Sequence, residues 1–512
     1  MIPLARVTTA RESAALDAST IAAGVPSRAL MQRAGAAAAS EIARRYASLL
    51  REPAAIYVGP GNNGGDGWVV ARALAAAGVR VRVVAAGDAR TDDAKAERAL
   101  AEPLVEREPP AAPPLIIDAL LGTGSSGAPR GEVAAAIAAV NAARDAGATV
   151  VALDVPSGLD ADGGDATHSV RADLTLTFGT MKRGLLVGRG VAGRIVLLDI
   201  GLLAPPDEGA LRLVSSPWVL SRIPAIPAEA HKGIRKKLVI IGGQIGMAGA
   251  PMLAARAAMR SGIGMVRLVV AHDNLPIVQE GLPEALARPW PGAREDEVRE
   301  AVTDWADAVL IGPGLGETPE SRSLAERVLS LWRGPVVVDA DGLNVFRGDA
   351  KKLSSLLAGR PALLTPHVAE FSRLHGASPD DVLARRFDIG VELARLTSAM
   401  VLLKGVPTIV SSATGARLVS AAGTPALAAA GSGDLLAGIA ATLLSHTGDA
   451  LFAGAAAAWA HGTAAELAGE NGPARGVTLT DIEAMLSRVW RLPDADCGYP
   501  VLAELPAAEP RP

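Results

Sequence analysis

The stretch "AAIYVGPGNNGGDGWVVARAL", residues 54 to 74, runs from an apolar segment through a glycine-rich corner into a second apolar segment. Gly59, Gly61 and Gly64 have the spacing of a dinucleotide-binding fingerprint. A strand, a glycine-rich loop and a helix in this order are typical of a parallel α/β sheet. The stretch therefore predicts such a sheet, with a loop that can approach a phosphate-bearing ligand.

Length and composition bound the class of protein. At 512 residues the chain exceeds one ordinary hydrophobic core, so we expect two domains or more. Hydrophobic residues make up 49% and aromatic residues only 3%, which indicates alanine-rich helices packed on aliphatic strands. The net charge of −4 argues against a nucleic-acid partner.

Cysteine content and apolar runs narrow the class further. Cys497 is the only cysteine, which excludes an intramolecular disulfide and argues against a cysteine zinc site. Residues 1–20 lack the apolar core of a secretory signal. No apolar run reaches the ~18 residues that a membrane-spanning helix needs. We therefore expect a soluble, cytoplasmic α/β protein with no membrane partner.

Strand and helix signals form two series along the chain. The strand-like segments of the first series are "AAIYVG", "VRVRVVAAG", "PLIIDALLG", "TVVALDVPSG", "ADLTLTFG" and "GRIVLLDIG". Apolar strands that alternate with alanine-rich helices predict a parallel sheet covered on both faces. The series ends near Gly201, and the proline-rich segment 202–233 is interpreted as the connection between domains.

The second series has strand-like segments of the same kind, from "KKLVIIGG" through "GMVRLVVA", "AVLIGPGLG", "GPVVVDADG", "ALLTPH" and "MVLLKG" to "TIVSS". Two late helices are expected at about 434–445 and 449–469. The predicted domains are 1–215 and 225–495. The Pro/Ala-rich tail, 496–512, is expected to be disordered.

The polar residues of the first corner leave two interpretations open. Asp88 lies near the position, about 20 residues on, where a dinucleotide-binding fold carries an acidic residue. However, Asn62, Asn63 and Asp66 occupy the helix start where a pyrophosphate would lie, and a carboxylate there repels a second anion. In the plainer interpretation, Asp66 caps its helix and Asn-Asn-Gly-Gly is a tight turn.

Two further corners place carboxylates at the ends of predicted strands. "DALLGTGSSGAPRG" contains Asp118 before a glycine-rich loop, and "DVPSGLDADGGD" contains Asp154. In a parallel sheet these strand ends meet at one edge, where ligands bind. Loop 122–128 can offer backbone N–H groups to a phosphate. Side-chain oxygens of Asn63, Asp118 and Ser157 would suit a hard monovalent or divalent cation.

Four motifs in order, "GPGNNGGDG", "DALLGTG", "DVPSGLDADGG" and "ADLTLTFGTMKRG", resemble the epimerase domain of the NAD(P)H-hydrate repair proteins. The resemblance covers nearly all of residues 1–215. It implies that the loop meets a nicotinamide dinucleotide as a damaged substrate, with no hydride transfer. It also implies that Asp154 is the acid/base and that Asn63, Asp118 and Ser157 hold a potassium ion. The residues implied to bind the hydrated dinucleotide are Asn62, Asn63, Gly64, Gly65, Asp66, Gly122, Thr123, Gly124, Ser125, Ser126, Gly127, Ala128 and Asp154.

A second group of polar motifs lies in the other half of the chain. "ALAAAGSGDLLAGIAATLLS" places Gly433 and Asp434 at the start of an apolar helix. Glycine amides there can form an anion hole, and Asp434 can act as a base toward a hydroxyl, although an acidic residue at this position is usually a helix cap. Taken singly, His367 would be a structural histidine and Lys404 a solvated charge. The strand-end residues that together favour a nucleotide site are Gly316, Asp339, Asp341, Asn344, His367, Lys404 and Thr408.

The second half resembles the dehydratase domain of the same repair proteins, which has a ribokinase-like fold. The motifs are "HKGIRKKLVIIGGQIGMAGAPMLAARAAMRSGIG", "IGPGLG", "DADGLN", "TPHVAE", "KGVPT" and "GSGDLLAG", which span residues 231–445. The residues implied to touch the hydrate are Ala257, Gly316, His367 and Asp434. Those implied to bind the adenine nucleotide are Lys404, Gly405, Val406, Pro407, Thr408 and Gly433.

The two resemblances together imply a bifunctional metabolite-repair enzyme. A Rossmann-like three-layer domain would interconvert the R and S forms of hydrated NADH and NADPH (NADHX and NADPHX). A ribokinase-like domain would dehydrate the S form at the expense of ADP, with Mg²⁺. We expect small-molecule substrates and a homo-oligomer. Two alternatives stay open on the residues: a ribokinase-like small-molecule kinase fused to a dinucleotide-binding domain, and a non-catalytic nucleotide-sensing protein.

Overall fold

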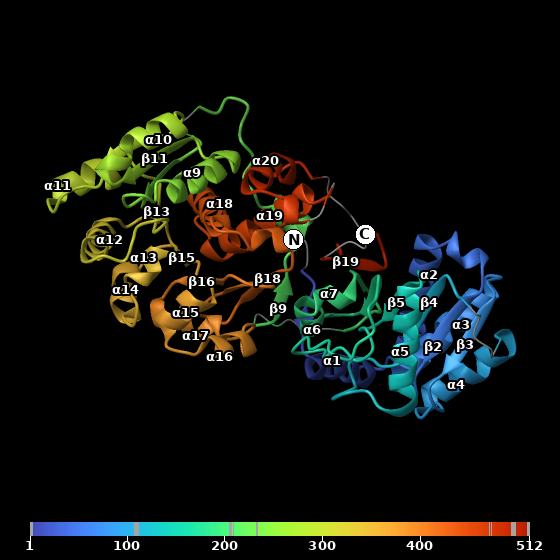
Figure 1. The fold of residues 1–512 in the computed structure, drawn as a ribbon. Coiled ribbons are helices and arrows are strands. Elements are labelled where there is room, and N and C mark those ends of the chain that lie inside the picture. The colour runs from blue at the N-terminus through green and yellow to red at the C-terminus, as the bar shows by residue number, and fades with distance from the viewer. Residues whose placement is uncertain are drawn as a thin grey trace. The chain divides into compact units, whose positions relative to one another are not determined.

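The chain folds into two compact units, each with its own sheet and core (Figure 1). The first unit contains residues 5–207 and 496–512, and the second contains residues 1–4 and 208–495. The computed structural model describes residues 4–106, 112–203, 207, 209–231, 234–470, 472, 474–492 and 498–508. Cys497 lies outside the described residues.

The first unit is built on a seven-stranded sheet with strand order β19-β8-β6-β5-β4-β2-β3. Neighbouring strands are parallel except for β19, which is antiparallel to β8. The strands are β2 (Ala54–Val58), β3 (Val81–Ala85), β4 (Leu115–Ala119), β5 (Thr149–Leu153), β6 (Leu174–Phe178), β8 (Arg194–Leu198) and β19 (Val501–Leu505). A separate parallel pair joins β1 (Val7–Thr8) to β7 (Met181–Lys182).

Helices cover both faces of this sheet, because alternate strand residues point to opposite sides. Ile56 and Ile117 pack in one core with α2 and α3, whereas Ala55 and Ile116 pack in another core with α5. The helices are α1 (Ala10–Ala22), α2 (Ser27–Arg45), α3 (Asn62–Ala76), α4 (Asp92–Ala101), α5 (Gly131–Asp145), α6 (Arg183–Val187) and α7 (Arg189–Ala192), with short turns at Leu49–Arg51 and Glu102–Leu104. The predicted three-layer arrangement is therefore present in this unit.

We predicted a disordered tail from its composition, but the described part of it, residues 498–508, contains a strand. Residues Val501–Leu505 form β19, which pairs with the exposed edge of β8. Glu504 on this strand accepts hydrogen bonds from Arg45 at 2.7 Å and from Arg194 at 2.6 Å. The prediction failed because an open sheet edge supplies backbone hydrogen bonds to a segment of low local strand propensity.

The second unit is built on a ten-stranded sheet with strand order β12-β11-β10-β13-β14-β15-β16-β17-β18-β9. The strands from β12 to β16 are parallel, whereas β17 is antiparallel to both of its neighbours. The strands are β9 (Leu211–Leu213), β10 (Lys237–Ile241), β11 (Met265–Val270), β12 (Leu286–Pro289), β13 (Ala308–Ile311), β14 (Val336–Val338), β15 (Ala362–Leu364), β16 (Met400–Leu403), β17 (Thr408–Ser411) and β18 (Arg417–Ser420).

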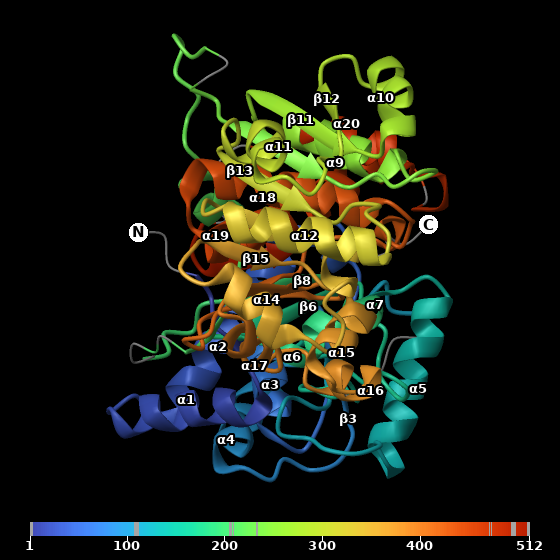
Figure 2. The same cartoon turned by 90° about the vertical axis from the view of Figure 1, so that its left-hand side faces the viewer.

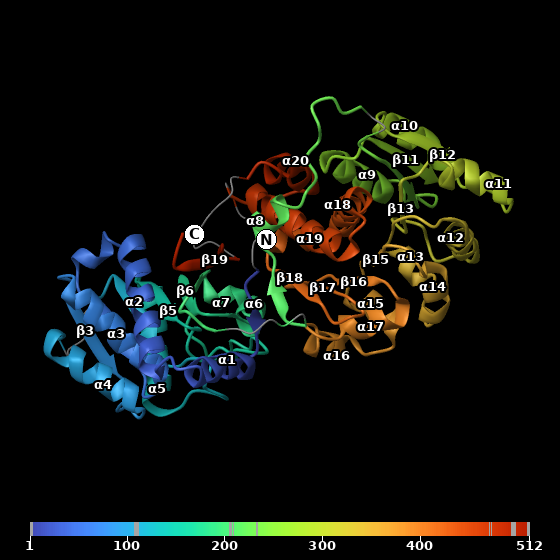
Figure 3. The same ribbon diagram turned by 180° about the vertical axis from the view of Figure 1, so that it is seen from behind.

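Two helical layers sandwich this sheet. One core contains α9 (Gly249–Arg260), α18 (Ser432–Thr447), α19 (Ala450–Ala468) and α20 (Leu479–Val489), which Figure 3 shows together. The other core contains α12 (Pro319–Leu331), α14 (Ala350–Leu357), α15 (Val368–His375) and α17 (Gly390–Thr397), on the side that faces the viewer in Figure 2. The remaining helices are α8 (Ser216–Leu220), α10 (Leu275–Gly281), α11 (Glu295–Val298), α13 (Asp341–Asn344) and α16 (Pro379–Ala384). Short turns lie at His272–Asn274, Arg299–Thr303, Pro425–Leu427 and Ala474–Gly476.

The fold class predicted from the sequence, two α/β units with parallel sheets, is confirmed. The predicted boundary at residue 215 differs from the structure, because β9 joins the second sheet beside β18. The segment was assigned to the connection because three residues are too few to show a periodic pattern. Within the described residues, no helix is long and apolar enough to cross a membrane.

Candidate active sites

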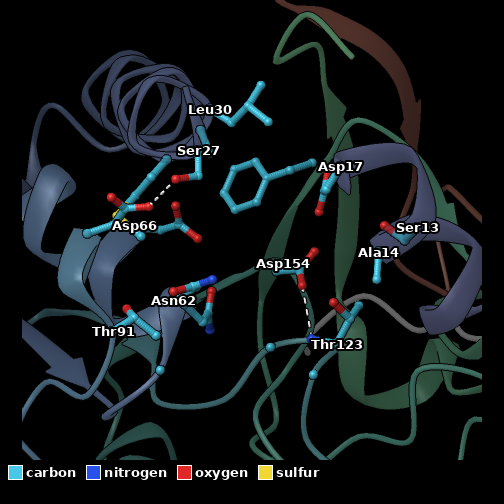
Figure 4. Close-up of a pocket in the computed structure, with 18 of the residues that line it drawn as sticks. Ser13, Ala14, Asp17, Ser27, Leu30, Asn62, Asp66, Thr91, Thr123 and Asp154 are labelled. Carbon is cyan, nitrogen blue, oxygen red and sulfur yellow. Dashed lines mark hydrogen bonds between the residues drawn. The ribbon is translucent and has the colours of Figure 1, made fainter. Parts of the chain in front are cut away.

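A cavity of about 640 Å³ opens in the first unit at the carboxyl ends of β2, β4 and β5 (Figure 4). The parallel strands bring together three corners that are far apart in the sequence, as the edge rule predicts. The residues that line it are Ser13, Ala14, Asp17, Ile21, Ser27, Leu30, Met31, Ala34, Pro60, Gly61, Asn62, Asn63, Asp66, Arg90, Thr91, Asp93, Leu120, Leu121, Gly122, Thr123, Gly124, Ser125, Asp154, Phe178, Lys182 and Ile200.

Asp154 forms a buried ion pair at the edge of this cavity. Lys182 Nζ lies 2.7 Å from Asp154 Oδ1, and the Thr123 amide donates to Asp154 Oδ2 at 3.1 Å. The backbone of Asp154 has φ +65°, a left-handed conformation that costs a non-glycine residue about 1–3 kcal/mol. The surrounding contacts hold this conformation, so the carboxylate has a fixed position against the cavity.

Sequence reasoning missed Lys182, although it lies inside the quoted motif "ADLTLTFGTMKRG". Its side chain is 2% exposed, and its ammonium group also donates to Thr177 Oγ1 at 3.0 Å and to the Phe178 carbonyl at 2.8 Å. A lysine buried this completely requires a carboxylate partner. The signal that could have identified it is its place in that motif, four residues after the strand that ends at Phe178.

Two further carboxyl groups face the cavity. Burial raises the pKa of Asp66 well above its ordinary value, and repulsion from Asp154 and Asp17 adds to the shift. Burial also raises the pKa of Asp17. Helix α3 begins after Gly61 with no side-chain cap, so the interpretation of Asp66 as a cap is wrong. The cavity thus raises the pKa of both carboxyl groups above that of an exposed aspartate.

The three residues predicted to bind a cation lie close together, and one of them, Asn63, also lines the cavity. Asp118 is completely buried and accepts hydrogen bonds from the Ser157 hydroxyl at 2.6 Å and the Ser157 amide at 2.8 Å. Burial raises the pKa of Asp118 to about 6. Asn63 donates to the Leu121 carbonyl at 2.8 Å, but its buried Oδ1 has no partner among the described residues. This arrangement leaves an amide oxygen available beside a buried carboxyl group.

The other predicted residues of the first unit fall into two groups. Asn62 and the segment 122–125 line the cavity, whereas Ser126, Gly127 and Ala128 are exposed and do not line it. Gly64 and Gly65 also do not line it. A Cβ on Gly64 would lie 1.9 Å from the Gly59 carbonyl oxygen. Gly64 therefore allows α3 to start close to the preceding loop, whereas Gly65 leaves room for the Met31 side chain of α2, which would lie 2.5 Å from a Cβ there.

The second unit contains a lysine–carboxylate cluster at the ends of β14 and β16. Lys404 Nζ lies 2.8 Å from Asp339 Oδ1 and 3.7 Å from Glu370 Oε2. Lys404 is thus not a solvated charge. Burial raises the pKa of Asp434 to about 7, with a further contribution from the negative charge of Asp339. A carboxyl group that titrates near neutrality suits general acid/base catalysis.

The start of α18 carries this acidic residue. Gly431, at φ +90°, precedes the helix without a side-chain cap, so Asp434 is not a helix cap. No described residue accepts a hydrogen bond from the amide of Gly433. A Cβ on Gly433 would lie 3.3 Å from Lys404 Nζ. An unpaired amide, a lysine and a carboxyl group thus converge on one point, which suits an anionic ligand.

His367 and Gly316 hold neighbouring loops in place. The His367 ring caps α15 by accepting hydrogen bonds from the amides of Ala369 at 3.1 Å and Glu370 at 3.3 Å. Burial lowers the pKa of His367, and the charge of Lys404 lowers it further. Gly316, at φ +77°, donates its amide to Asp341 Oδ2 at 2.8 Å. His367 is half exposed, and its Nε2 lies 3.3 Å from Glu370 Oε1 in the lysine–carboxylate cluster.

The predicted substrate contact of Ala257 stays a prediction. Ala257 lies in α9 with none of its surface exposed, in the core that α9 shares with α18. A contact with the substrate would therefore need an opening into this core. Within the predicted nucleotide-binding segment, Gly405 and Val406 are exposed, Val406 by 67%, whereas Pro407 is buried.

Sequence reasoning also missed His461, a lone histidine in the alanine-rich helix α19. Its Nε2 lies 3.2 Å from the Ser432 hydroxyl at the start of α18, and both groups are buried. Burial lowers the pKa of His461 to about 4. A neutral histidine thus fixes the residue next to Gly433.

Both units thus place buried carboxyl and lysine groups at the ligand-binding edge of a parallel sheet. This arrangement is that of a two-domain α/β protein with one candidate acid/base centre in each unit. A family model described as YjeF-related protein N-terminus matches residues 27–184, and one described as NAD(P)H-hydrate dehydratase matches residues 238–488.

Proteins named bifunctional NAD(P)H-hydrate repair enzyme are similar over nearly the whole chain. The one from Salinibacter ruber is 37% identical and covers 94% of this chain and 96% of its own. The one from Coxiella burnetii is 35% identical and covers 92% and 96%. A crystal structure of an ADP/ATP-dependent NAD(P)H-hydrate dehydratase from Bacillus subtilis is 28% identical, covers 54% of this chain and 96% of its own, and has a TM-score of 0.47.

The chain belongs to the family of bifunctional NAD(P)H-hydrate repair enzymes. It is an enzyme that combines NAD(P)H-hydrate epimerase and dehydratase functions. The resemblance identified from the motifs is confirmed, and the alternatives of a small-molecule kinase and of a non-catalytic sensor are wrong.

Proposed function

We propose that the first unit epimerises R and S NAD(P)HX and that the second unit dehydrates the S form at the expense of ADP. The observation that carries this division is that each unit holds its own acid/base centre, Asp154 with Lys182 in one and Asp434 beside Lys404 in the other. Two carboxyl groups with separate surroundings can serve two reactions.

In the first unit, Asp154 moves the proton that accompanies loss and return of the hydroxyl group at C6 of the hydrated nicotinamide ring. The lone pair of the ring nitrogen helps to expel the hydroxyl. Lys182 holds the carboxylate in position through the 2.7 Å ion pair. Asp66, with its raised pKa, donates a hydrogen bond to the departing oxygen.

Asn63, Asp118 and Ser157 would hold a potassium ion. The unpartnered Asn63 Oδ1 and the buried carboxyl group of Asp118 fit such an ion, because only oxygen ligands are present and only one carries charge. The ion would supply positive charge beneath the loops that bind the phosphates of the dinucleotide. It would also satisfy the buried amide oxygen.

In the second unit, Asp434 takes the proton of the substrate hydroxyl. The terminal phosphoryl group of ADP is transferred to the hydroxyl oxygen. Loss of phosphate then replaces loss of hydroxide, and the Gly433 amide stabilises the leaving anion. The segment Lys404 to Thr408 binds the nucleotide. Asp434 is crowded by Asp339 and Asp341, and this excess of negative charge fits a nucleotide that arrives with Mg²⁺.

The decisive experiment gives the purified protein a mixture of R and S NADHX with ADP or ATP. If more NADH is recovered than the S NADHX present at the start, both the epimerase and the dehydratase must be active. With ADP absent, conversion of R to S without NADH formation isolates the epimerase. If the S form persists in the presence of both nucleotides, the dehydratase assignment is wrong.

The proposed ligands are NADHX, NADPHX and ADP. The expected homo-oligomer and the cytoplasmic location stay predictions, which size-exclusion chromatography with light scattering and cell fractionation would test. The division into residues 1–215 and 225–495 as independent domains also stays a prediction. Its test must consider that β19, from the C-terminal tail, completes the first sheet.

A further inference from the structure

The loop after β3 reaches the substrate cavity through Arg90. The Arg90 amide donates to the Pro60 carbonyl at 2.8 Å, which joins this loop to the glycine-rich corner before α3. Arg90 and Thr91 both line the cavity, and Figure 4 shows Thr91 beside Asn62. The loop after β3 is thus part of the wall that faces the substrate.

The charges around the cavity leave this arginine available. Of the described residues that line it, four are aspartates and two are cations, Arg90 and Lys182. Lys182 is occupied by Asp154, and the cavity residue Asp93 accepts a hydrogen bond from Ser27 at 2.6 Å. The exposed guanidinium of Arg90 forms no ion pair or hydrogen bond with a described residue. Of the two described cations that line the cavity, Arg90 is therefore the one available to bind a phosphate.

The acidic residue of the same loop faces elsewhere. Asp88 lies near the position where dinucleotide-binding folds carry an acidic residue that binds a ribose 2′-hydroxyl. In this structure Asp88 Oδ1 is paired with Arg98 NH1 at 2.9 Å, and Asp88 does not line the cavity. An arginine near this position accommodates a 2′-phosphate in such folds. The loop therefore presents a cation instead of a carboxylate.

The distance across the sheet matches a dinucleotide. Asp154 follows β5 and Arg90 follows β3, and the strand order β5-β4-β2-β3 separates these ends by three strand spacings. Three spacings are roughly 14 Å. A dinucleotide whose nicotinamide ring lies at Asp154 can thus extend along this edge and bring its adenosine ribose to the β3 loop.

We propose that Arg90 binds the 2′-phosphate of NADPHX and makes the first unit prefer NADPHX over NADHX. This inference rests on the proposed epimerase function of that unit. The backbone amides near Gly61 and Gly122 serve the pyrophosphate, which both hydrates carry. Arg90 serves the additional phosphate, which only NADPHX carries, by a charge-assisted hydrogen bond.

The test compares the full-length wild type with Arg90→Gln and the control Arg80→Gln. Arg80 is an exposed arginine just before β3, at the opposite end of the strand, and it pairs with Glu52 at 3.6 Å. Initial rates of R-to-S conversion are measured for NADHX and NADPHX without ADP, after subtraction of the spontaneous rate. Both substitutions remove one positive charge, but only Arg90→Gln removes a charge that lines the cavity.

For Arg90→Gln we expect kcat/KM for NADPHX to fall by roughly 10- to 100-fold. The value for NADHX should stay within about twofold of wild type, because Arg90 does not serve the pyrophosphate. Arg80→Gln should change neither value. Added salt should narrow the wild-type preference for NADPHX, because it screens an exposed pair. An equal loss on both hydrates, or no loss on NADPHX, overturns the proposal.

A second measurement does not depend on turnover. Hydrogen exchange of amides 86–94 should slow more with NADPHX than with NADHX in the wild type, and Arg90→Gln should remove this difference. Equal protection by the two hydrates overturns the assignment of Arg90. If the wild type shows selective protection but no epimerisation, the epimerase function fails while the phosphate site stands.

Discussion

The two active sites use the same components in different pairings. In the first unit, the buried Lys182 pairs with Asp154, the proposed acid/base. In the second unit, Lys404 pairs with Asp339, and Asp434 is left beside them without an ion pair among the described residues. Burial and neighbouring negative charge then raise the pKa of Asp434 to about 7. The choice of lysine partner thus decides which carboxyl group is ion-paired and which titrates near neutrality.

The sharpest test of this comparison removes each of the two proposed catalytic carboxylates in turn. Asp154→Asn should reduce epimerisation by about 10²- to 10⁴-fold and leave dehydration of S-hydrate unchanged, because general acid/base groups contribute this much. Asp434→Asn should reduce dehydration of S-hydrate and leave epimerisation unchanged, and this variant should still bind nucleotide. Separate assays of R-to-S conversion and NADH formation would show whether either substitution affects both reactions, which would contradict two independent sites.

Removal of each lysine should destabilise its own unit. Lys182→Met leaves Asp154 without its partner, and loss of one member of a buried pair costs about 3–5 kcal/mol of unfolding free energy. Lys404→Met is the matched variant in the second unit. Heat inactivation followed by each assay would assign the loss. Equal inactivation of both activities by Lys182→Met would contradict the separation of the units.

The pH dependence of dehydration should report the titration of Asp434. Its base form is lost as pH falls through about 7, so kcat/KM should drop by about tenfold per pH unit below this value. The pH profile of kcat/KM between pH 5 and 9, with binding measured separately, would show this limb. A flat profile from pH 6 to 8 would mean that Asp434 is not the base.

Removal of the potassium ion proposed for the first unit should have a smaller, several-fold effect, on the rate of epimerisation only. Replacement of potassium by tetramethylammonium should slow epimerisation, because Asn63 Oδ1 then lacks its partner. Asn63→Ala should abolish the response to potassium. Anomalous diffraction would locate the ion beside Asp118. Tightly bound zinc at this position would contradict the assignment.

The smallest effect concerns the tail strand of the first unit. Glu504→Gln weakens the pairs with Arg45 and Arg194, one of which is half exposed, so the cost should be about 1 kcal/mol or less. Glu470→Gln, which breaks an exposed pair with Arg488 in the second unit, is the control. The midpoint of heat inactivation of the epimerase should fall slightly in the first variant only. A larger effect on the dehydratase would show that β19 matters to the other unit.

The sequence determined the architecture because its signals are local. Each strand, glycine-rich loop and helix is encoded within about 20 consecutive residues, and parallel strands place successive loops at one edge. The convergence of Asn63, Asp118 and Ser157 therefore followed from the motifs alone. The starts of α18 and α19 were predictable for the same reason.

Only the tertiary structure decided which side chains and strands pair with each other and which carboxyl groups have shifted pKa values. Glu504 meets Arg194 across 310 residues of sequence, and β9 joins β18 from a segment that looks like a linker. The core position of Ala257 depends on which helix packs against α9. Burial and neighbouring charges, which set the pKa of Asp434, arise only when the chain has folded, because no local pattern encodes the distance between remote side chains.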